Sequence, residues 1–364
     1  MDFTFGETQQ AVARVAAHVL DQGQLAAEPG EPYDSALWKE LGQAGLLSLA
    51  LPAWLGGDGL SVLDTAVLLT EVGRRAAPVP ALATLGLGVL PVVRWGDRDL
   101  QQALLAGVAA GNTVLTAAVR EPSDPMPPAP ATTAWLSGGG GSGTVTGVKV
   151  GVPYGAAADR ILVPASIASG GTGVVIVDPS ADGVTLLSTP SSAGQPEYTL
   201  RLDEAPIAHV LGAEAGGRVV ADLYQLAVAS ACSLADGALA AALTLTTAHV
   251  GSREQFGRPL AAFQAVAQQI ADVYIVSRTL HLAALSACWR LETGREAGSD
   301  LDVAAYWLTQ HGPQALRACH HLHGGIGMDV TYPLHRYSSL VRDLVRYVGG
   351  ADYRLDRLGA RVCG

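Results

Sequence analysis

The sequence has few charged and few aromatic side chains. Charged residues make up 15% and aromatic residues 5% of the 364 residues. Twenty-three lysines and arginines stand against 33 aspartates and glutamates, which gives a net charge of -10. This excess of acid opposes binding to nucleic acid and to anionic membrane surfaces, so we expect neither as a partner. Because 49% of the residues are hydrophobic, the chain can bury a large core, which excludes disorder as its main state.

Cysteine is also scarce. Cys232, Cys288, Cys319 and Cys363 lie far apart, with no Cys-x-x-Cys pair. This spacing argues against a disulfide scaffold or a metal cluster and fits a reducing compartment. The N-terminus, MDFTFGETQQ, carries acidic residues where a signal peptide has a basic region followed by an apolar one. We therefore expect a cytoplasmic protein.

Residues 1–115 are expected to form an N-terminal α-helical domain. Thr4–Leu20 repeats apolar residues at helical spacing, and Ser35 and Ser61 are candidate caps of two further helices. The uncharged run Ala76–Val93 approaches membrane-spanning length, but its prolines and glycines would break a spanning helix. This run therefore predicts a turn followed by a buried helix.

Residues 116–212 are expected to form a middle β domain. Proline and glycine cluster between Glu121 and Gly143, which excludes long helices there. The run of four glycines at 138–141 predicts a flexible loop, because no helix start follows it as a phosphate loop requires. Short β-like runs separated by turns then predict a small antiparallel barrel or sandwich. These runs are 144–150, 160–163, 173–177, 184–186 and 198–202.

Residues 213–364 return to helical spacing. Val219–Val250 is apolar on nearly every face, which is typical of a core helix. Three further long helices joined by short turns complete an antiparallel four-helix bundle. They are expected at Ala261–Arg290, Leu301–Leu322 and Pro333–Arg361. The expected fold class is thus α+β, with a β domain between two helical domains.

The first residue cluster that could carry chemistry is Arg253-Glu-Gln-Phe-Gly257. Gly257 and Pro259 mark a turn between two long helices, so Arg253 lies at a helix end and Phe256 in the turn. An arginine there can fork onto a phosphate while the aromatic ring covers a planar group. A helix-ending arginine with an ordinary capping role explains the same residues, and the motif alone leaves both interpretations open.

The second cluster is Cys319-His-His-Leu-His-Gly-Gly-Ile-Gly327. Gly324 and Gly325 can end a helix and expose backbone amides that cradle an anion. Adjacent histidines point to different sides of a helix, and the spacing of the histidines and Cys319 matches no familiar zinc pattern. We therefore expect packing or hydrogen-bonding histidines and no metal site.

Together these clusters resemble the acyl-CoA dehydrogenase family, and the resemblance spans almost the whole chain. Leu-Pro-Ala-Trp-Leu-Gly-Gly-Asp-Gly-Leu at 51–60 is similar to the family's Pro-x-x-x-Gly-Gly-x-Gly turn, and Thr144–Val163 to its β-hairpin. Arg253-x-x-Phe-Gly and His323-Gly-Gly-Ile-Gly resemble its two most specific signatures. The resemblance implies the fold of that family and FAD as the cofactor.

In that family the two signatures reach across a dimer interface and bind the ADP half of an FAD held mainly by the neighbouring subunit. His321 stands where the family usually has a glutamine, and its ring can still donate a hydrogen bond. The resemblance therefore implies a cofactor-binding set of Arg253, Gln255, Phe256, His321, Gly324 and Gly325.

The family's catalytic base is missing. Removing the α-proton of an acyl thioester needs a carboxylate, which the family places at one of two positions. These positions hold Ala227 and Val348 here, and neither can accept a proton. Asp236 lies nine residues past Ala227, about 180° around an ideal helix, and so faces away. Asp352 is the best fallback, although a solvated carboxylate at a helix start is the interpretation we favour.

The residues expected to hold the chain's own flavin ring also depart from the family. Glu121-Pro-Ser-Asp124 replaces a longer Gly-rich motif, and Val150-Gly-Val-Pro-Tyr154 replaces the aromatic and hydroxyl residues after the hairpin lysine. Gly350 and Asp352 stand where threonine and glutamine are usual. The half-site for its own ring is thus eroded, while the half-site offered to a neighbour is intact.

This asymmetry resembles the non-catalytic subunit of the heteromeric α2β2 acyl-CoA dehydrogenases of actinobacteria, which act on bulky CoA thioesters, notably steroid side chains. The resemblance implies an oxidoreductase subunit in lipid metabolism and steroid degradation, which completes the FAD site of a catalytic partner. Two alternatives stay open. One is a self-sufficient homo-oligomeric flavoenzyme with a displaced base such as Asp352, and the other is a non-redox scaffold that binds an acyl thioester or a protein.

Overall fold

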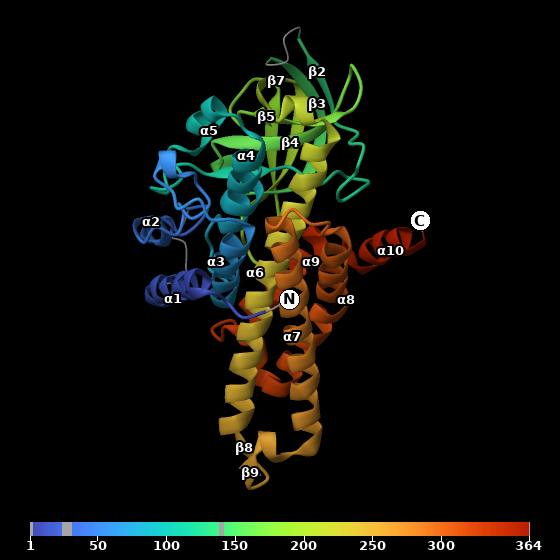
Figure 1. Cartoon of the computed structure of the whole chain (residues 1–364). Helices are drawn as coiled ribbons and strands as arrows, with labels where there is room; N and C mark the ends of the chain where they lie inside the picture. Colours follow the sequence, from blue (N-terminus) through green and yellow to red (C-terminus); the bar gives the residue numbers. More distant parts are fainter. Residues whose placement is uncertain (1–2, 24–30, 138–141, 364) are drawn as a thin grey trace.

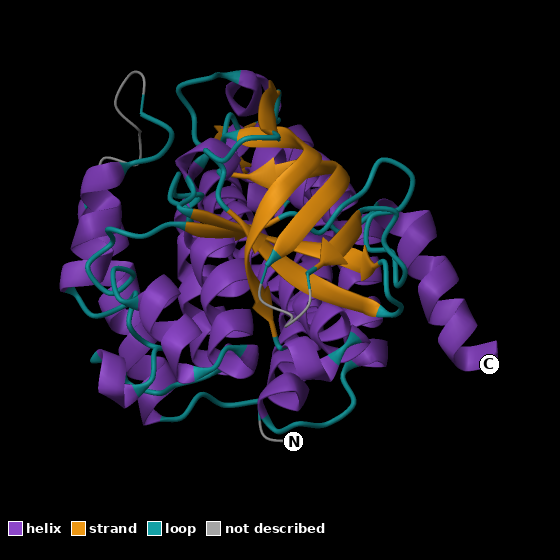
Figure 2. Cartoon of the chain, turned by 90° about the horizontal axis from the view of Figure 1, so that it is seen from above, coloured by secondary structure: helices purple, strands orange, loops and turns teal. Residues whose placement is uncertain are grey.

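The computed structural model describes residues 3–23, 31–137 and 142–363. The molecule is elongated, with a β barrel at one end and a long helical hairpin at the other (Figure 1). Seen along this axis, the sheet lies over the helices and the C-terminal helix stands out to one side (Figure 2). A helical region, a barrel and a helical bundle follow one another along the chain, which confirms the expected α+β class.

Short helices make up the N-terminal region, and their caps follow from the sequence. Asp34 rather than the expected Ser35 caps α2, because its carboxylate accepts from the Leu37 N–H at 2.9 Å. Ser61 opens α3 in a reciprocal capping box with Asp64. The helices are α1 (Glu7–Gln22), α2 (Ser35–Gln43), α3 (Val62–Arg75), α4 (Leu90–Trp95) and α5 (Arg98–Leu105), with a 3₁₀ turn η1 (Ala53–Leu55).

The uncharged run after α3 forms a turn followed by a buried helix, as predicted. Ala76 is left-handed (φ 45°), and the chain then enters η2 (Leu82–Val89), which has π-helical geometry. Two glycines of η2 permit close packing: a Cβ on Gly86 would lie 2.4 Å from the Ser230 hydroxyl oxygen, and one on Gly88 would lie 2.3 Å from the Leu115 Cβ. Buried η2 thus joins the helical region to the barrel.

A closed sheet forms the middle region. In the described part of the chain its strands pair in the order β1-β4-β2-β3-β7-β5, β5 closes back onto β4, and β6 pairs with β7. The barrel prediction is confirmed, but the sheet is mixed, because β4 runs parallel to both β1 and β2. The strands are β1 (Leu115–Ala117), β2 (Thr133–Leu136), β3 (Gly143–Pro153), β4 (Arg160–Ile167), β5 (Thr172–Val177), β6 (Val184–Thr189) and β7 (Glu197–Leu211).

The sequence analysis missed β1 and β2, since each is short and β2 lies inside the Pro/Gly-rich stretch. The predicted glycine loop at 138–141 lies outside the described residues. The boundaries at 115/116 and 212/213 stay predictions, although the strands of the barrel run from Leu115 to Leu211.

Long helices form the C-terminal region. The core-helix prediction is confirmed by α6, which is long and apolar enough to cross a membrane but has 83% of its most apolar window buried inside the protein. The predicted single helix Pro333–Arg361 is wrong, because Gly349 (φ 98°) and Gly350 (φ 83°) break it into two. The helices are α6 (Gly217–Ser252), α7 (Gln264–Glu292), α8 (Gly298–His323), α9 (Leu334–Tyr347) and α10 (Gly350–Cys363).

Candidate functional site: an exposed half-site and a closed ring site

The Arg253 motif forms a tight hairpin at the tip of the α6–α7 pair. Strands β8 (Glu254–Gln255) and β9 (Arg258–Pro259) flank a two-residue turn of Phe256 and Gly257. Both turn residues have positive φ, 55° and 78°, as this hairpin type requires. Glycine adopts this conformation freely, whereas phenylalanine is strained in it. Phe256 is 90% exposed at the tip of this turn.

The side chains of this hairpin are available to a ligand. Arg253 caps the end of α6 through its backbone, with its N–H donating to the His249 carbonyl at 2.8 Å. Its guanidinium is exposed and has no ion pair within the described ranges. Gln255 is exposed and donates only to the neighbouring Glu254 carbonyl. The backbone N–H of Arg253 therefore makes the helix-capping bond, and the guanidinium charge of Arg253 stays free to bind a ligand.

The second motif ends α8 in an open glycine turn. Gly324 has φ 61° and ψ -137°, a region open essentially to glycine alone. Gly325 follows in η6 (Gly324–Met328), and both glycines are exposed with nothing within 4 Å of where a Cβ would lie. His321, one turn before them, is also exposed. A ligand can therefore approach bare backbone at this point.

The ends of α6 and α8 lie side by side, which brings the two motifs together. The rings of His249 and His323 stack with their centroids 4.5 Å apart. Burial and then the charge of Arg253 lower the pKa of His249, so this ring stays neutral at pH 7. Burial, opposed by the bond to Cys319 and reinforced by neighbouring histidines, also lowers the pKa of His323. Two neutral rings can stack without charge repulsion.

Histidines also hold the glycine turn in place. His323 Nδ1 lies 2.8 Å from the Cys319 carbonyl, so Nδ1 carries the proton and Nε2 accepts from the Tyr332 hydroxyl at 3.0 Å. His320 Nδ1 likewise donates to the Gly327 carbonyl at 2.9 Å. These rings have hydrogen-bonding roles, as expected, and no group of three potential metal ligands occurs within the residues that the structure describes.

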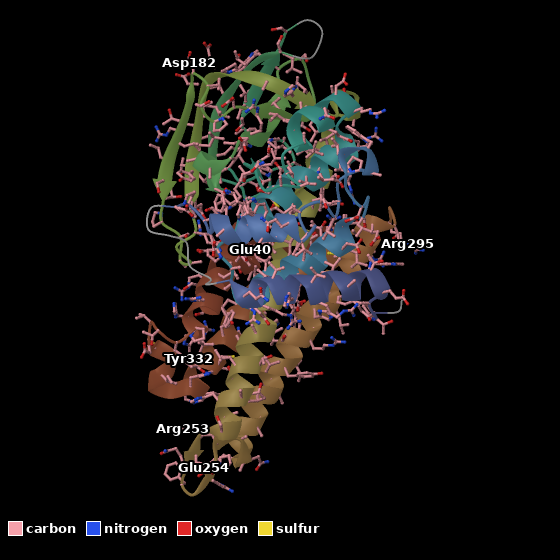
Figure 3. The ribbon with its side chains drawn as sticks, turned by 90° about the vertical axis from the view of Figure 1, so that its left-hand side faces the viewer. Glu40, Asp182, Arg253, Glu254, Arg295 and Tyr332 are labelled. Atoms are coloured by element: carbon pink, nitrogen blue, oxygen red, sulfur yellow. The ribbon has the colours of Figure 1, made fainter. Side chains whose placement is uncertain are left out.

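This half-site lies far from the chain's own barrel. Figure 3 shows Arg253 and Glu254 at one end of the molecule and Asp182, in the barrel, at the other. A cofactor held by this barrel cannot reach this hairpin. The half-site therefore faces outward, toward whatever molecule covers the tip of the bundle.

The place expected for the chain's own flavin ring is closed. β3 bulges between Lys149 and Val152, and Gly151 takes φ 65°. A Cβ at Gly151 would lie 2.6 Å from an Arg120 guanidinium nitrogen, so Arg120 fills the space into which a larger side chain at this position would extend. Nearby, Glu197 accepts two bonds from Arg346 at 2.5 and 2.6 Å.

Little space remains beside these residues. The cavity lined by Gly151, Pro153, Glu197 and Tyr347 has a volume of 50 Å³. Small-molecule sites usually measure roughly 300–1,000 Å³, whereas one water needs only about 10–15 Å³. A tricyclic flavin ring does not fit this cavity.

The positions of the missing base are packed into the core. Ala227 and Val348 are both fully buried, and the Val348 carbonyl accepts from Arg354 Nε at 2.6 Å. Asp236 pairs instead with His281 at 2.8 Å. Asp352 lies exposed in the first turn of α10. The structure thus places the fallback carboxylate in solvent.

A buried ion pair was missed by the sequence analysis. Lys149 Nζ lies 2.7 Å from Glu121 Oε1, and both side chains are almost completely buried inside the barrel. Burial lowers the pKa of Lys149 to about 8, although the bond to Glu121 opposes this shift. Burial raises the pKa of Glu121, but Lys149 and the N–H groups of Thr132 and Ala131 outweigh it and lower the pKa overall. The signal was present, since Lys149 is the one charge in an otherwise uncharged β run.

Comparison with known proteins agrees with this geometry. Family models described as the acyl-CoA dehydrogenase N-terminal and C-terminal domains match residues 6–112 and 216–362. The chain belongs to the acyl-CoA dehydrogenase family. The resemblance and the FAD cofactor of that family, expected from the motifs, are confirmed.

Individual relatives in this family are similar over nearly their whole length. "Acyl-CoA dehydrogenase FadE28" of Mycobacterium tuberculosis is 47% identical, and the match covers 99% of each chain. A solved variant of the "Tcur3481-Tcur3483 steroid ACAD" is 33% identical with a TM-score of 0.92 and covers 99% of each chain. The "ChsE4-ChsE5 complex" of Mycobacterium tuberculosis is 32% identical with a TM-score of 0.91 and covers 100% of this chain and 99% of the other.

Proposed function

We propose that this chain is the non-catalytic subunit of a heterotetrameric, FAD-dependent acyl-CoA dehydrogenase and completes the FAD site of a catalytic partner. One observation carries the proposal: the half-site for a neighbour's cofactor is open and exposed, while the chain's own ring site has 50 Å³ of space. Two of the similar solved proteins, Tcur3481-Tcur3483 and ChsE4-ChsE5, are named as pairs of different chains. A catalytic partner chain would provide the flavin-ring site that this chain lacks, and its cofactor would occupy the half-site that this chain exposes.

The half-site offers groups suited to the ADP end of FAD. The free guanidinium of Arg253 can fork onto a phosphate oxygen pair, and the exposed Phe256 ring can cover a planar base. Backbone at Gly324 and Gly325, with the ring of His321 and the amide of Gln255, supplies neutral polar contacts. When bound, FAD supplies the acceptor for hydride, and this chain's part is to bind and orient the cofactor.

Exposed apolar side chains around the half-site support a protein partner. Phe256 is 90%, Met328 78% and Val330 81% exposed, and Tyr274 and Ile275 on α7 are more than half exposed. Monomeric proteins seldom expose so many large apolar groups in one region. Covering this end of the bundle would remove that surface from water and bring the partner's cofactor to the hairpin.

The reaction of the assembly would be α,β-desaturation of a CoA thioester, with a steroid side chain as the acyl class. The steroid class comes from the name of one solved relative, the Tcur3481-Tcur3483 steroid ACAD. The base that removes the α-proton would come from the partner, because Ala227 and Val348 carry no proton acceptor. A cytoplasmic location is part of the same proposal and fits the free, buried thiols of Cys232, Cys288 and Cys319.

Co-expression tests the proposal. The chain purified alone should carry no flavin absorbance, whereas the chain purified with a catalytic partner should be yellow and active on an acyl-CoA. Dehydrogenation of an acyl-CoA by the lone chain, with bound flavin, would reject the proposal.

Replacing Asp352 with asparagine should leave kcat and KM of the active complex unchanged, because this carboxylate is exposed and has no role as a base. Steady-state kinetics of D352N beside the unaltered complex measures this. General acid–base catalysis typically contributes a factor of about 100 or more to the rate, so a loss of kcat of that size would instead favour the displaced-base alternative.

A further inference from the structure

A cavity of about 220 Å³ lies between α8 and α9. The apolar part of its wall comes from both helices and consists of Pro313, Leu316, Val341 and Val345. Leu316 and Val341 are buried and form its floor. None of these residues lines the closed ring site or belongs to the exposed half-site. An engineered cavity of about 150 Å³ holds a benzene molecule, so this volume admits one aromatic ring with a small head group.

Two arginines supply charge to this cavity, and no acidic residue lines it within the described part of the chain. Arg317 comes from α8 and Arg342 from α9, and both are exposed, with no ion pair to another described residue. Asp343 follows Arg342 in the sequence, but its carboxylate accepts from two N–H groups of the β6–β7 loop at 2.9 and 2.8 Å. Two positive charges therefore share one small space, where they repel each other until a ligand of opposite charge binds.

The other two polar side chains of the lining, His320 and Ser338, are already bonded within the protein. His320 Nε2 lies 2.9 Å from the Ser338 hydroxyl oxygen. His320 Nδ1 donates to the Gly327 carbonyl at 2.9 Å. The guanidinium groups of the two arginines are therefore the donors that remain for a ligand in the cavity.

We propose that this cavity binds a small phosphate monoester, with its apolar body on the floor of Leu316 and Val341 and its phosphate paired with both arginines. A phosphate monoester carries about two negative charges near neutral pH, which match the two uncompensated cations. Its terminal oxygens can accept paired N–H bonds from two guanidinium forks, whereas a carboxylate brings one charge and fewer oxygens. The apolar wall favours a monoester with a hydrocarbon body over inorganic phosphate, because binding removes that body from water.

Calorimetric titration of the purified full chain with phenyl phosphate tests this proposal. We expect saturable binding of one phenyl phosphate per chain. Inorganic phosphate lacks the apolar body, phenol lacks the charge and benzoate brings a single charge, so each should bind more weakly by about tenfold or more. Arg317→Gln and Arg342→Gln should each weaken phenyl phosphate binding about tenfold, as expected for loss of one hydrogen bond to a charged group. Arg278→Gln, which removes an exposed arginine of α7 outside the lining, is the matched control and should bind as the unaltered chain does.

Several results would overturn the proposal. Equal binding of phenol would show that the arginines do not select an anion, equal binding of benzoate would remove the preference for two charges, and equal binding of inorganic phosphate would show that the apolar wall plays no part. Absence of saturable phenyl phosphate binding, or a loss in Arg278→Gln as large as in both cavity variants, would do the same. If either glutamine variant fails to fold, Arg317→Lys and Arg342→Lys keep the charge without the fork and should weaken binding several-fold. The titration involves neither FAD nor a partner chain, so its failure leaves the proposed function standing.

Discussion

Glu121→Gln should lower the free energy of unfolding by about 3–5 kcal/mol, the usual cost of removing one partner of a buried ion pair. Glu121 accepts from Lys149 Nζ, from the Ala131 and Thr132 N–H groups and from the Thr132 hydroxyl, all within 3.0 Å. Glutamine keeps the shape of the side chain but leaves the Lys149 ammonium without its counter-charge inside the barrel. Lys149 is 0% exposed, so water cannot replace the lost carboxylate.

Urea unfolding followed by circular dichroism measures this loss. Glu40→Gln is the control, because Glu40 is exposed (Figure 3) and such surface changes usually stay within about 0.5 kcal/mol. The double variant Glu121→Gln/Lys149→Met should recover much of the loss by removing the stranded charge. A loss for Glu121→Gln no larger than that for Glu40→Gln would contradict the buried ion pair.

The same pair gives a direction for the pH dependence. The pKa of Glu121 is lower in the folded chain than its ordinary value, so the unfolded state takes up the proton first as the solution is acidified. The contribution of this carboxylate to stability is therefore present above the ordinary pKa near 4.5 and is lost as pH falls through the lower folded value. Glu121→Gln should not show this part of the acid-induced loss.

Arg253→Gln should weaken the affinity of the heteromeric complex for FAD by about 10- to 100-fold. A hydrogen bond to a charged group contributes about 1.5–3 kcal/mol, and each 1.4 kcal/mol corresponds to a factor of ten. The Arg253 backbone, not its side chain, makes the helix cap, so the substitution leaves the fold of the hairpin intact. The expected effect is therefore on cofactor affinity and not on stability.

Fluorescence titration of the flavin-free complex with FAD measures this affinity. Arg295→Gln is the matched control, since Arg295 is an exposed arginine and Figure 3 shows it well away from Arg253. The unfolding transitions of both variants should coincide with that of the unaltered complex. Equal FAD affinity in Arg253→Gln and Arg295→Gln would show that this hairpin does not contact the cofactor.

Much of the fold follows from local patterns in the sequence. Several signals lie within short stretches of the chain and can be identified there. They are the apolar residues of α6, the capping box at Ser61 and the turn residues between β4, β5 and β6. The parallel pairing of β4 with β1 and β2 could not be predicted in this way, because it joins strands that long segments of the chain separate. The break after Val348 depends on two adjacent glycines with positive φ, and at Gly349 the close approach of Tyr353 and Pro125, which leaves no room for a Cβ, arises only in the folded chain.

The candidate site was predictable in part for the same reason. Arg253, Phe256, Gly324 and Gly325 lie in contiguous motifs, so the sequence could identify the half-site. The closing of the ring site could not be predicted, because Arg120, Gly151 and Arg346 come from distant parts of the chain and meet only in the folded barrel. The bond from Arg354 to Asp302 likewise joins α10 to α8 across more than 50 residues.

The flavin content of the purified heteromeric complex tests the asymmetry most directly. Absorbance at the flavin band, set against the amount of each chain, gives the number of FAD molecules per protomer. With one open ring site in the partner and none in this chain, we predict one FAD for every two chains. One FAD for every chain would show that this barrel also holds a flavin ring and would contradict the account.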